Sequence, residues 1–171
     1  HLCKAGAIPA FLFPPQNVHA HYRNHVVRIP SMPTFGQVIR TMPTKHYHID
    51  RTENSPQIDL DVDNGVMEFI GRSLPHNSEQ FYSRVYGWLD EYLQSAKGET
   101  TVNMRLDYLD TSSSKHIYNI FSRLDAVTAL GRPVKVNWHY ETGDEEMAET
   151  GKDYESLFKM DFSFIEVEDL F

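Results

Sequence analysis

The stretch VNMRLDYLDTSSSKHIYNIFSRLDAV, residues 102–127, is the most informative about the fold, because the spacing of its apolar residues changes from every second position to every third or fourth. The first part carries an apolar side chain at every second residue from Val102 to Tyr108, which predicts a half-buried β-strand. From Ile117 to Val127, apolar residues recur three and four positions apart, which predicts an amphipathic helix. Residues 110–115 are therefore predicted to be a strand-to-helix junction, called the hydroxyl turn below.

The same two periods continue on both sides of this stretch. Further strands are predicted at 58–62 and 66–70, around a turn at Asp63-Asn64-Gly65, and later at 134–140 and 162–167. Helices are predicted over 77–95, with Asn77 as N-cap, and through 158 after Asp144, which can cap this later helix. Gly131-Arg132-Pro133 ends the helix that follows the hydroxyl turn. The predicted order of elements is β-β-α-β-α-β-α-β.

This order indicates the fold class. Each strand-helix-strand passage needs a crossover, which is right-handed almost without exception and gives parallel pairing. Because the later strands alternate instead of being apolar throughout, one face of the sheet should be covered and the other partly open. We predict an α/β two-layer domain with a mixed sheet of about four to six strands and helices mainly on one face. The pattern does not determine the strand order.

Composition narrows the classes of function. A chain of 171 residues with 40% hydrophobic residues can bury the core of one domain, and its formal net charge of −8 opposes binding to nucleic acid or to anionic membranes. The single cysteine, Cys3, excludes an intramolecular disulfide. No apolar run approaches the roughly 18 residues that a membrane span requires. We expect a cytoplasmic protein without direct membrane insertion, whose partner is a protein or a small molecule.

The first 44 residues differ from the remainder. Residues 1–49 contain no acidic residue and carry a charge of +5, whereas the chain from Asp50 onward carries −13; six of the nine prolines also lie before residue 44. Two interpretations are open, an organelle-targeting peptide or a disordered or non-native extension, and the scarcity of serine favours the extension. The domain is expected over 45–171. Paired histidines at 19, 21, 46 and 48 lack nearby carboxylates or thiols, so no metal site is predicted.

The hydroxyl turn itself allows three interpretations. Thr111, Ser112 or Ser113 could cap the helix that follows, because a side-chain oxygen there accepts from backbone N–H groups without intrahelical partners. A phosphate at the same place would meet free N–H groups and the positive end of the helix dipole. The run from Ser112 to Lys115 also matches the S-x-x-K pattern of penicillin-binding enzymes, but the S-D-N and K-T-G companions are missing. We therefore expect no enzyme activity, and we expect no cofactor.

Two other polar clusters have simple explanations. The acids of the segment from Asp144 to Glu149 complement the dipole of a helix that begins there. His139 is expected on the strand face opposite Trp138, near Arg105 and Asp107, as part of a solvated face or a partner surface.

Several ordered motifs resemble the SiaC-type regulatory phosphoproteins of bacteria. The resemblance covers about residues 48–168 and none of residues 1–44. The motifs that carry it are Arg51-Thr52, Ser55-Pro56, Gly71-Arg72-Ser73 with Pro75 and Asn77, Trp88-Leu89 with Tyr92-Leu93, Tyr108 with Thr111-Ser112-Ser113-Ser114-Lys115, Trp138-His139-Tyr140, and Asp144, Met147, Glu149 and Gly151 followed by Tyr154.

This resemblance implies a fold similar to the STAS domain of anti-sigma factor antagonists. It also implies phosphorylation of Thr111 by a dedicated kinase, reversal by a PP2C-like phosphatase, and binding and stimulation of a membrane-associated diguanylate cyclase by the unmodified form. The site residues would then be Thr111 as phosphoacceptor, with Asp110, Ser112, Ser113, Ser114, Lys115 and Arg72 in the partner-binding turn. The alternative is a constitutive STAS-like binding module for a sigma-factor regulator.

The sequence departs from the family pattern at three positions. It has Asp110 where asparagine is expected, and Leu74 and His76 where an aromatic residue and an acid are expected. Asp110 places a negative charge beside the predicted phosphoacceptor.

Overall fold

The computed structural model describes residues 45–95 and 98–171, and the extension predicted over residues 1–44 lies outside these ranges. The described part contains six strands and three helices. They are β1 (His46–Ile49), β2 (Gln57–Asp61), β3 (Val66–Ser73), α1 (Ser78–Ser95), β4 (Thr100–Leu109), α2 (Thr111–Thr128), β5 (Val134–Glu141), α3 (Glu145–Leu157) and β6 (Asp161–Val167). The predicted elements from residue 58 onward are all present, and their order is as predicted.

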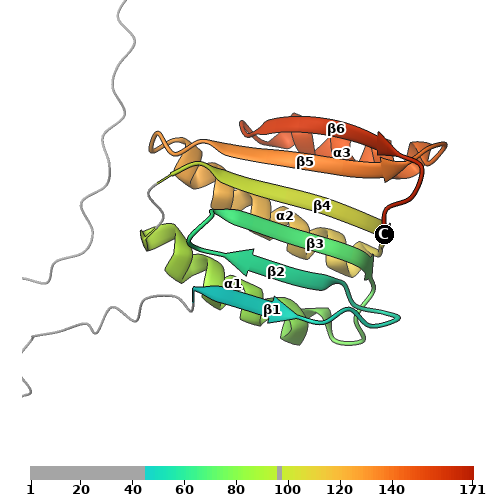
Figure 1. Ribbon diagram of the computed structural model, residues 1–171, viewed down its shortest axis with the longest axis horizontal. Helices are drawn as coiled ribbons and strands as arrows, with labels where there is room; N and C mark the ends of the chain where they lie inside the picture. The colour runs from blue at the N-terminus through green and yellow to red at the C-terminus, as the bar shows by residue number, and fades with distance from the viewer. Residues whose placement is uncertain (1–44, 96–97) are drawn as a thin grey trace, which may run out of the picture. The chain divides into compact units, whose positions relative to one another are not determined.

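The strands stand in the sheet in the order of the chain, β1-β2-β3-β4-β5-β6. The pairs β1/β2 and β2/β3 are antiparallel, whereas β3/β4, β4/β5 and β5/β6 are parallel. Because each crossover advances the sheet in the same direction and has the same hand, the three helices lie on one face, behind the sheet in Figure 1. The mixed sheet with one covered face is therefore confirmed.

The core lies between the sheet and the helices, and the strands show why. Along β4, the side chains at even positions from Thr100 to Leu106 are buried, whereas those at odd positions are only partly buried. The same alternation occurs in β2, β3 and β5, as expected when one face packs against helices. The largest buried side chains include Phe69, Tyr82, Tyr92, Phe121 and Trp138.

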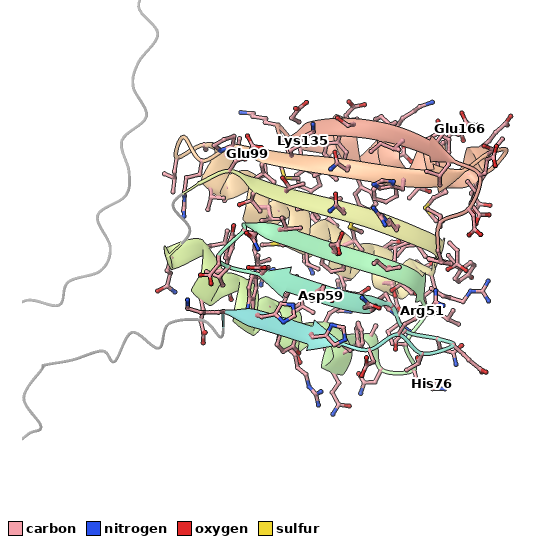
Figure 2. All side chains as sticks on the ribbon, viewed as in Figure 1. Arg51, Asp59, His76, Glu99, Lys135 and Glu166 are labelled. Carbon is pink, nitrogen blue, oxygen red and sulfur yellow. The ribbon has the colours of Figure 1, made fainter. Side chains whose placement is uncertain are left out.

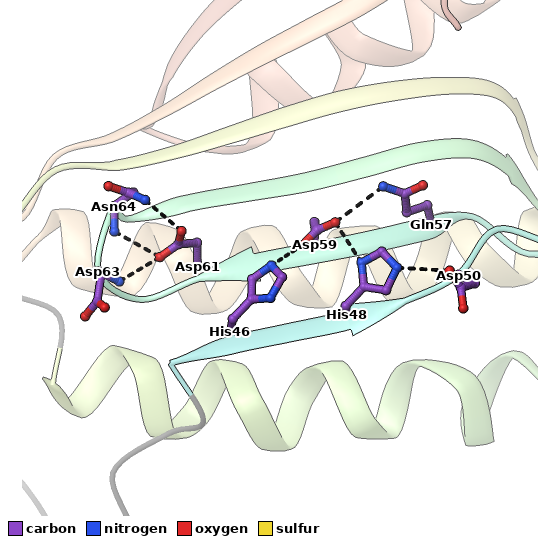
Figure 3. Close-up of polar contacts among 8 residues, drawn as sticks. All are labelled: His46, His48, Asp50, Gln57, Asp59, Asp61, Asp63 and Asn64. Atoms are coloured by element: carbon purple, nitrogen blue, oxygen red, sulfur yellow. Dashed lines mark hydrogen bonds and ion pairs between the residues drawn. The ribbon is translucent and has the colours of Figure 1, made fainter.

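One strand, β1, was absent from the predicted order. It is an exposed edge strand of four residues, too short for a clear period, and it pairs with β2. Two polar side chains tie it to that neighbour: His46 bonds to one oxygen of Asp59, and His48 Nδ1 lies 2.7 Å from the other (Figure 3). His48 Nε2 is also 3.1 Å from Asp50. Within the described ranges, no three His, Cys, Asp or Glu side chains are placed to hold a metal ion.

These contacts predict a pH dependence of the edge strand. Hydrogen bonds to Asp50 and then Asp59 raise the pKa of His48. Because this pKa is raised, protonated His48 stabilises the folded protein fully below about pH 6.5, the pKa of histidine in the unfolded chain. This stabilisation is lost as the pH rises through the pKa of His48 in the folded protein. Backbone amides of β1 should exchange with deuterium faster, relative to intrinsic rates, at about pH 8.5 than at about pH 6. The variant His48→Gln should lose this difference, and equal protection of wild-type β1 at both pH values would contradict the prediction.

Candidate functional site

The hydroxyl turn is built on Asp110, which lies between β4 and α2. Its backbone is extended (φ −78°, ψ 164°), and its carboxylate accepts a hydrogen bond of 2.7 Å from the backbone N–H of Ser113. The Ser112 hydroxyl donates to the same carboxylate at 3.0 Å. Asp110 is therefore the N-cap of α2, and the expectation that Thr111, Ser112 or Ser113 takes this role was wrong. An aspartate directly before the first turn meets the free N–H groups first and places its charge at the positive end of the dipole.

The four hydroxyl groups of the turn have different environments. Thr111, the first residue of α2, is exposed, and its hydroxyl makes no hydrogen bond to another described residue. Ser112 is exposed but bonded to Asp110, whereas Ser113 is buried. The Ser114 hydroxyl donates to the backbone carbonyl of Asp110 at 2.9 Å. Thr111 is thus the hydroxyl of the four that is both accessible and uncommitted.

A buried polar cluster holds the turn against α1. Tyr82 bonds to Ser73 through their hydroxyls at 2.6 Å and stacks on the ring of His116, with centroids 4.9 Å apart. His116 Nδ1 lies 2.6 Å from the Tyr86 hydroxyl, and burial lowers the pKa of His116. No sequence pattern predicts this cluster, because its members come from three elements, β3, α1 and α2. These contacts pack the start of α2 against α1 and the end of β3.

Arg72, predicted to take part in partner binding, lies on the adjacent strand. The backbone N–H of Asp110 donates to the carbonyl of Ser73 at 3.0 Å, so the end of β3 and the hydroxyl turn share one edge of the sheet. No hydrogen bond or ion pair within the described residues joins Arg72 to residues 110–115. The guanidinium of Arg72 lies 5.4 Å from the ring centroid of Tyr108. The structure thus places Arg72 beside the turn but not in it.

The other predicted clusters have structural roles. The carboxylate of Asp144 accepts from the backbone N–H of Met147 at 2.9 Å, so this acid caps α3 as predicted. His139 pairs with Arg105 across the sheet, on the open face, and burial followed by the Arg105 charge lowers its pKa. Lys115 is exposed, and among the described residues no hydrogen bond joins it to Ser112, as an S-x-x-K catalytic pair would require.

The cap residue supports a stability prediction. Replacing Asp110 with alanine should lower the free energy of unfolding by about 1 kcal/mol, because the N–H of Ser113 loses its acceptor. Asp110→Asn keeps an acceptor at the same place and should cost much less. Urea unfolding followed by circular dichroism measures both values. An equal loss in the two variants would show that charge, and not the cap, stabilises this turn.

Within the described ranges, none of the helices combines the length and the apolarity needed to cross a bilayer. The model of the SiaC family of regulatory phosphoproteins matches residues 49–167. An uncharacterised protein of Pseudomonas aeruginosa, strain UCBPP-PA14, is 33% identical over 117 residues, which are 68% of this chain and 90% of the relative.

Solved structures give the same result. The crystal structure of the diguanylate cyclase SiaD in complex with its activator SiaC, from Pseudomonas aeruginosa, contains a chain that matches with a TM-score of 0.68 at 30% identity, covering 71% of this chain and 99% of that one. Apo-SiaC from Pseudomonas aeruginosa matches with a TM-score of 0.66 at 29% identity, over 70% of this chain and 98% of that one. The chain described here belongs to the SiaC family of regulatory phosphoproteins.

Proposed function

We propose that this protein is a regulator of a diguanylate cyclase, which it binds and stimulates when Thr111 is unmodified and releases when Thr111 is phosphorylated. The observation that carries the proposal is the match to SiaC, which was solved as the activator bound to the diguanylate cyclase SiaD, over 99% of that chain. The regulatory unit is residues 45–171, and it acts by binding and not by catalysis.

The environment of Thr111 supports its role as the phosphoacceptor. A kinase must reach the hydroxyl, and Thr111 is exposed while Ser113 is buried. Ser112 and Ser114 already donate to the carboxylate and the carbonyl of Asp110, so phosphorylation of either would break an existing bond. The partners implied are a dedicated protein kinase that recognises this turn and a PP2C-like phosphatase that restores it.

The charge at the turn explains how a phosphate would release the cyclase. The carboxylate of Asp110 already occupies the cap and accepts from the Ser113 N–H. A phosphate on Thr111 adds a charge of about −1.5 to −2 next to this carboxylate. Binding of the cyclase would then have to desolvate two adjacent negative groups, which is costly unless the partner supplies cations. Asp110 should make this switch more sensitive to phosphate than asparagine would.

The test is to co-express the full chain with its kinase and to locate the phosphate by mass spectrometry. We expect a single phosphate on Thr111, and the phosphorylated protein should neither bind the cyclase nor raise its rate of cyclic di-GMP synthesis. A phosphate on Ser113 with Thr111 unmodified would refute the assignment of the site. A wild-type, unmodified protein that leaves the cyclase unbound would refute the proposed function.

A further inference from the structure

A hollow of about 650 Å³ lies at the edge of the sheet where β3 ends. Its lining residues come from the segment between β1 and β2, from β3 and β4, and from the last residue, Phe171. Figure 2 shows Arg51 at this edge of the sheet. Two arginines, Arg51 and Arg72, line this hollow together with two acids, Glu53 and Asp107. We call it the Arg51–Arg72 pocket.

The fold makes room for Arg51. Gly71 has a φ of +107°, which L side chains rarely adopt, and a Cβ added there would lie 2.5 Å from Cδ of Arg51. The side chain of Arg51 therefore crosses β3 where only glycine is tolerated. Its guanidinium carbon lies 4.6 Å from the ring centroid of Phe171, which leaves the N–H edge available to a ligand.

Arg72 is directed into the pocket by an irregularity of the sheet. The register of β3 against β4 shifts between Gly71 and Arg72, and such bulges change the direction in which a side chain points. The side chain of Arg72 is 51% exposed, and its Nε lies 3.7 Å from Oδ2 of Asp107, too far for a good hydrogen bond. Its guanidinium is held over Tyr108 and keeps donors for another acceptor.

The pocket has unused hydrogen-bond donors. Within the described residues, no carboxylate lies within 4.0 Å of the Arg51 guanidinium. The Nε of Arg72 approaches Oδ2 of Asp107 only to 3.7 Å, and Oδ1 of Asp107 is buried out of reach of a ligand. A complementary ligand must therefore accept hydrogen bonds from the two guanidinium groups. The carboxylate of an acidic side chain does so, because it accepts two parallel N–H donors from an arginine.

We propose that the Arg51–Arg72 pocket binds an acidic segment of the partner protein, which under the proposed function is the cyclase. This inference rests on the proposed function and adds the surface and the chemistry of recognition. The pocket and the hydroxyl turn share an edge of the sheet, since Ser73, the residue after Arg72, accepts from the N–H of Asp110. A segment seated in the pocket brings the partner beside Thr111, so that a phosphate there meets a negatively charged partner.

The experiment compares full-length variants of equal net charge. Arg51→Gln with Arg72→Gln should weaken cyclase binding at least about 100-fold and reduce its dependence on salt, because two charge-assisted contacts are lost. The control, Lys152→Gln with Lys159→Gln, removes two exposed cations in and after α3, away from the pocket, and should stay within about twofold of wild type. Binding is measured by calorimetry at two salt concentrations, after circular dichroism has confirmed folding. Should the double variant not fold, Arg72→Gln alone carries the test, because Arg72 is half exposed.

The outcomes separate the two proposals. If wild type binds the cyclase and the arginine double variant binds equally well, the pocket assignment is overturned and the proposed function stands. If wild type does not bind, the proposed function fails and the pocket assignment fails with it. A titration with inorganic phosphate, monitored by NMR of the arginine side chains, tests whether the pocket is a site for small anions and not for a peptide segment. Saturation by phosphate without any loss of cyclase affinity would also overturn the assignment.

Discussion

Replacing Thr111 with aspartate should weaken binding to the cyclase by at least about 30-fold, which corresponds to about 2 kcal/mol, while Thr111→Ala should bind as wild type does. The reason is that the hydroxyl of Thr111 is exposed and free of hydrogen bonds to the other described residues, so its removal costs nothing in the folded protein. A carboxylate at the same place stands next to that of Asp110, whose own pKa is depressed. Burial acts to raise that pKa, but the hydrogen bonds from Ser113 and Ser112 outweigh it.

The control for this experiment lies on the same helix. Ser122 is exposed on α2, well beyond the first turn, so Ser122→Asp changes the net charge equally and should leave cyclase binding unchanged. Binding is measured by calorimetry with the full chain. Equal affinity of the alanine and aspartate variants at Thr111 would remove the switch. It would favour the alternative, a constitutive binding module in which the turn is only a cap.

Replacing Trp138 with alanine should destabilise the domain by about 3–5 kcal/mol. Trp138 is 1% exposed, the largest of the fully buried side chains, and its Nε1 donates to the carbonyl of Met147 at 3.0 Å. This bond ties β5 to the first turns of α3. Urea unfolding followed by circular dichroism gives the free energy directly, and a loss below about 1 kcal/mol would contradict the packing described here.

Gly151 provides a sharper test of the same contact. A Cβ at Gly151 would lie 2.7 Å from Cδ1 and Nε1 of Trp138, so Gly151→Ala should cost about 1–3 kcal/mol through overpacking. In the Trp138→Ala background this cost should fall, because the side chain that clashes is gone. It should not vanish, since Phe164 lies 2.8 Å from the same Cβ position. Additive effects of the two substitutions would show that α3 shifts away from β5 instead.

Local patterns predicted the elements well. The alternation from Val102 to Tyr108 became β4, and the stripe from Ile117 to Val127 became the buried face of α2. Asn77 and Asp144 are helix caps as expected, with the Gln80 N–H donating to Asn77 at 3.0 Å. In contrast, β1 was missed, because the alternation from His46 to Ile49 covers only four residues, too few to predict a strand, and this exposed edge strand is stabilised by its pairing with β2.

The candidate site was predicted only in part. The change of hydrophobic period locates the hydroxyl turn, and the resemblance names Asp110 and Thr111, but the cap is Asp110 and not one of the predicted residues, Thr111, Ser112 or Ser113. Which of several adjacent side chains caps a helix depends on the residue at which the preceding strand ends. Here the backbone N–H of Asp110 still donates to the carbonyl of Ser73 in β3, so the helix begins only at the next residue. Arg51 was noted in the sequence only as part of a motif shared with the SiaC family. Nothing local indicates that its side chain crosses Gly71 and reaches Phe171.

The element types, the α/β class, the one-sided burial of the strands and the position of the hydroxyl turn can all be predicted from the sequence. These properties follow from interactions between residues a few positions apart, which a hydrophobic period records directly. The tertiary structure alone decided the strand order, the role of Asp110 as cap, the burial of Ser113 and the meeting of Arg51 with Arg72 in one pocket. Each of these depends on contacts between segments distant in the chain, and such contacts leave no period in the sequence.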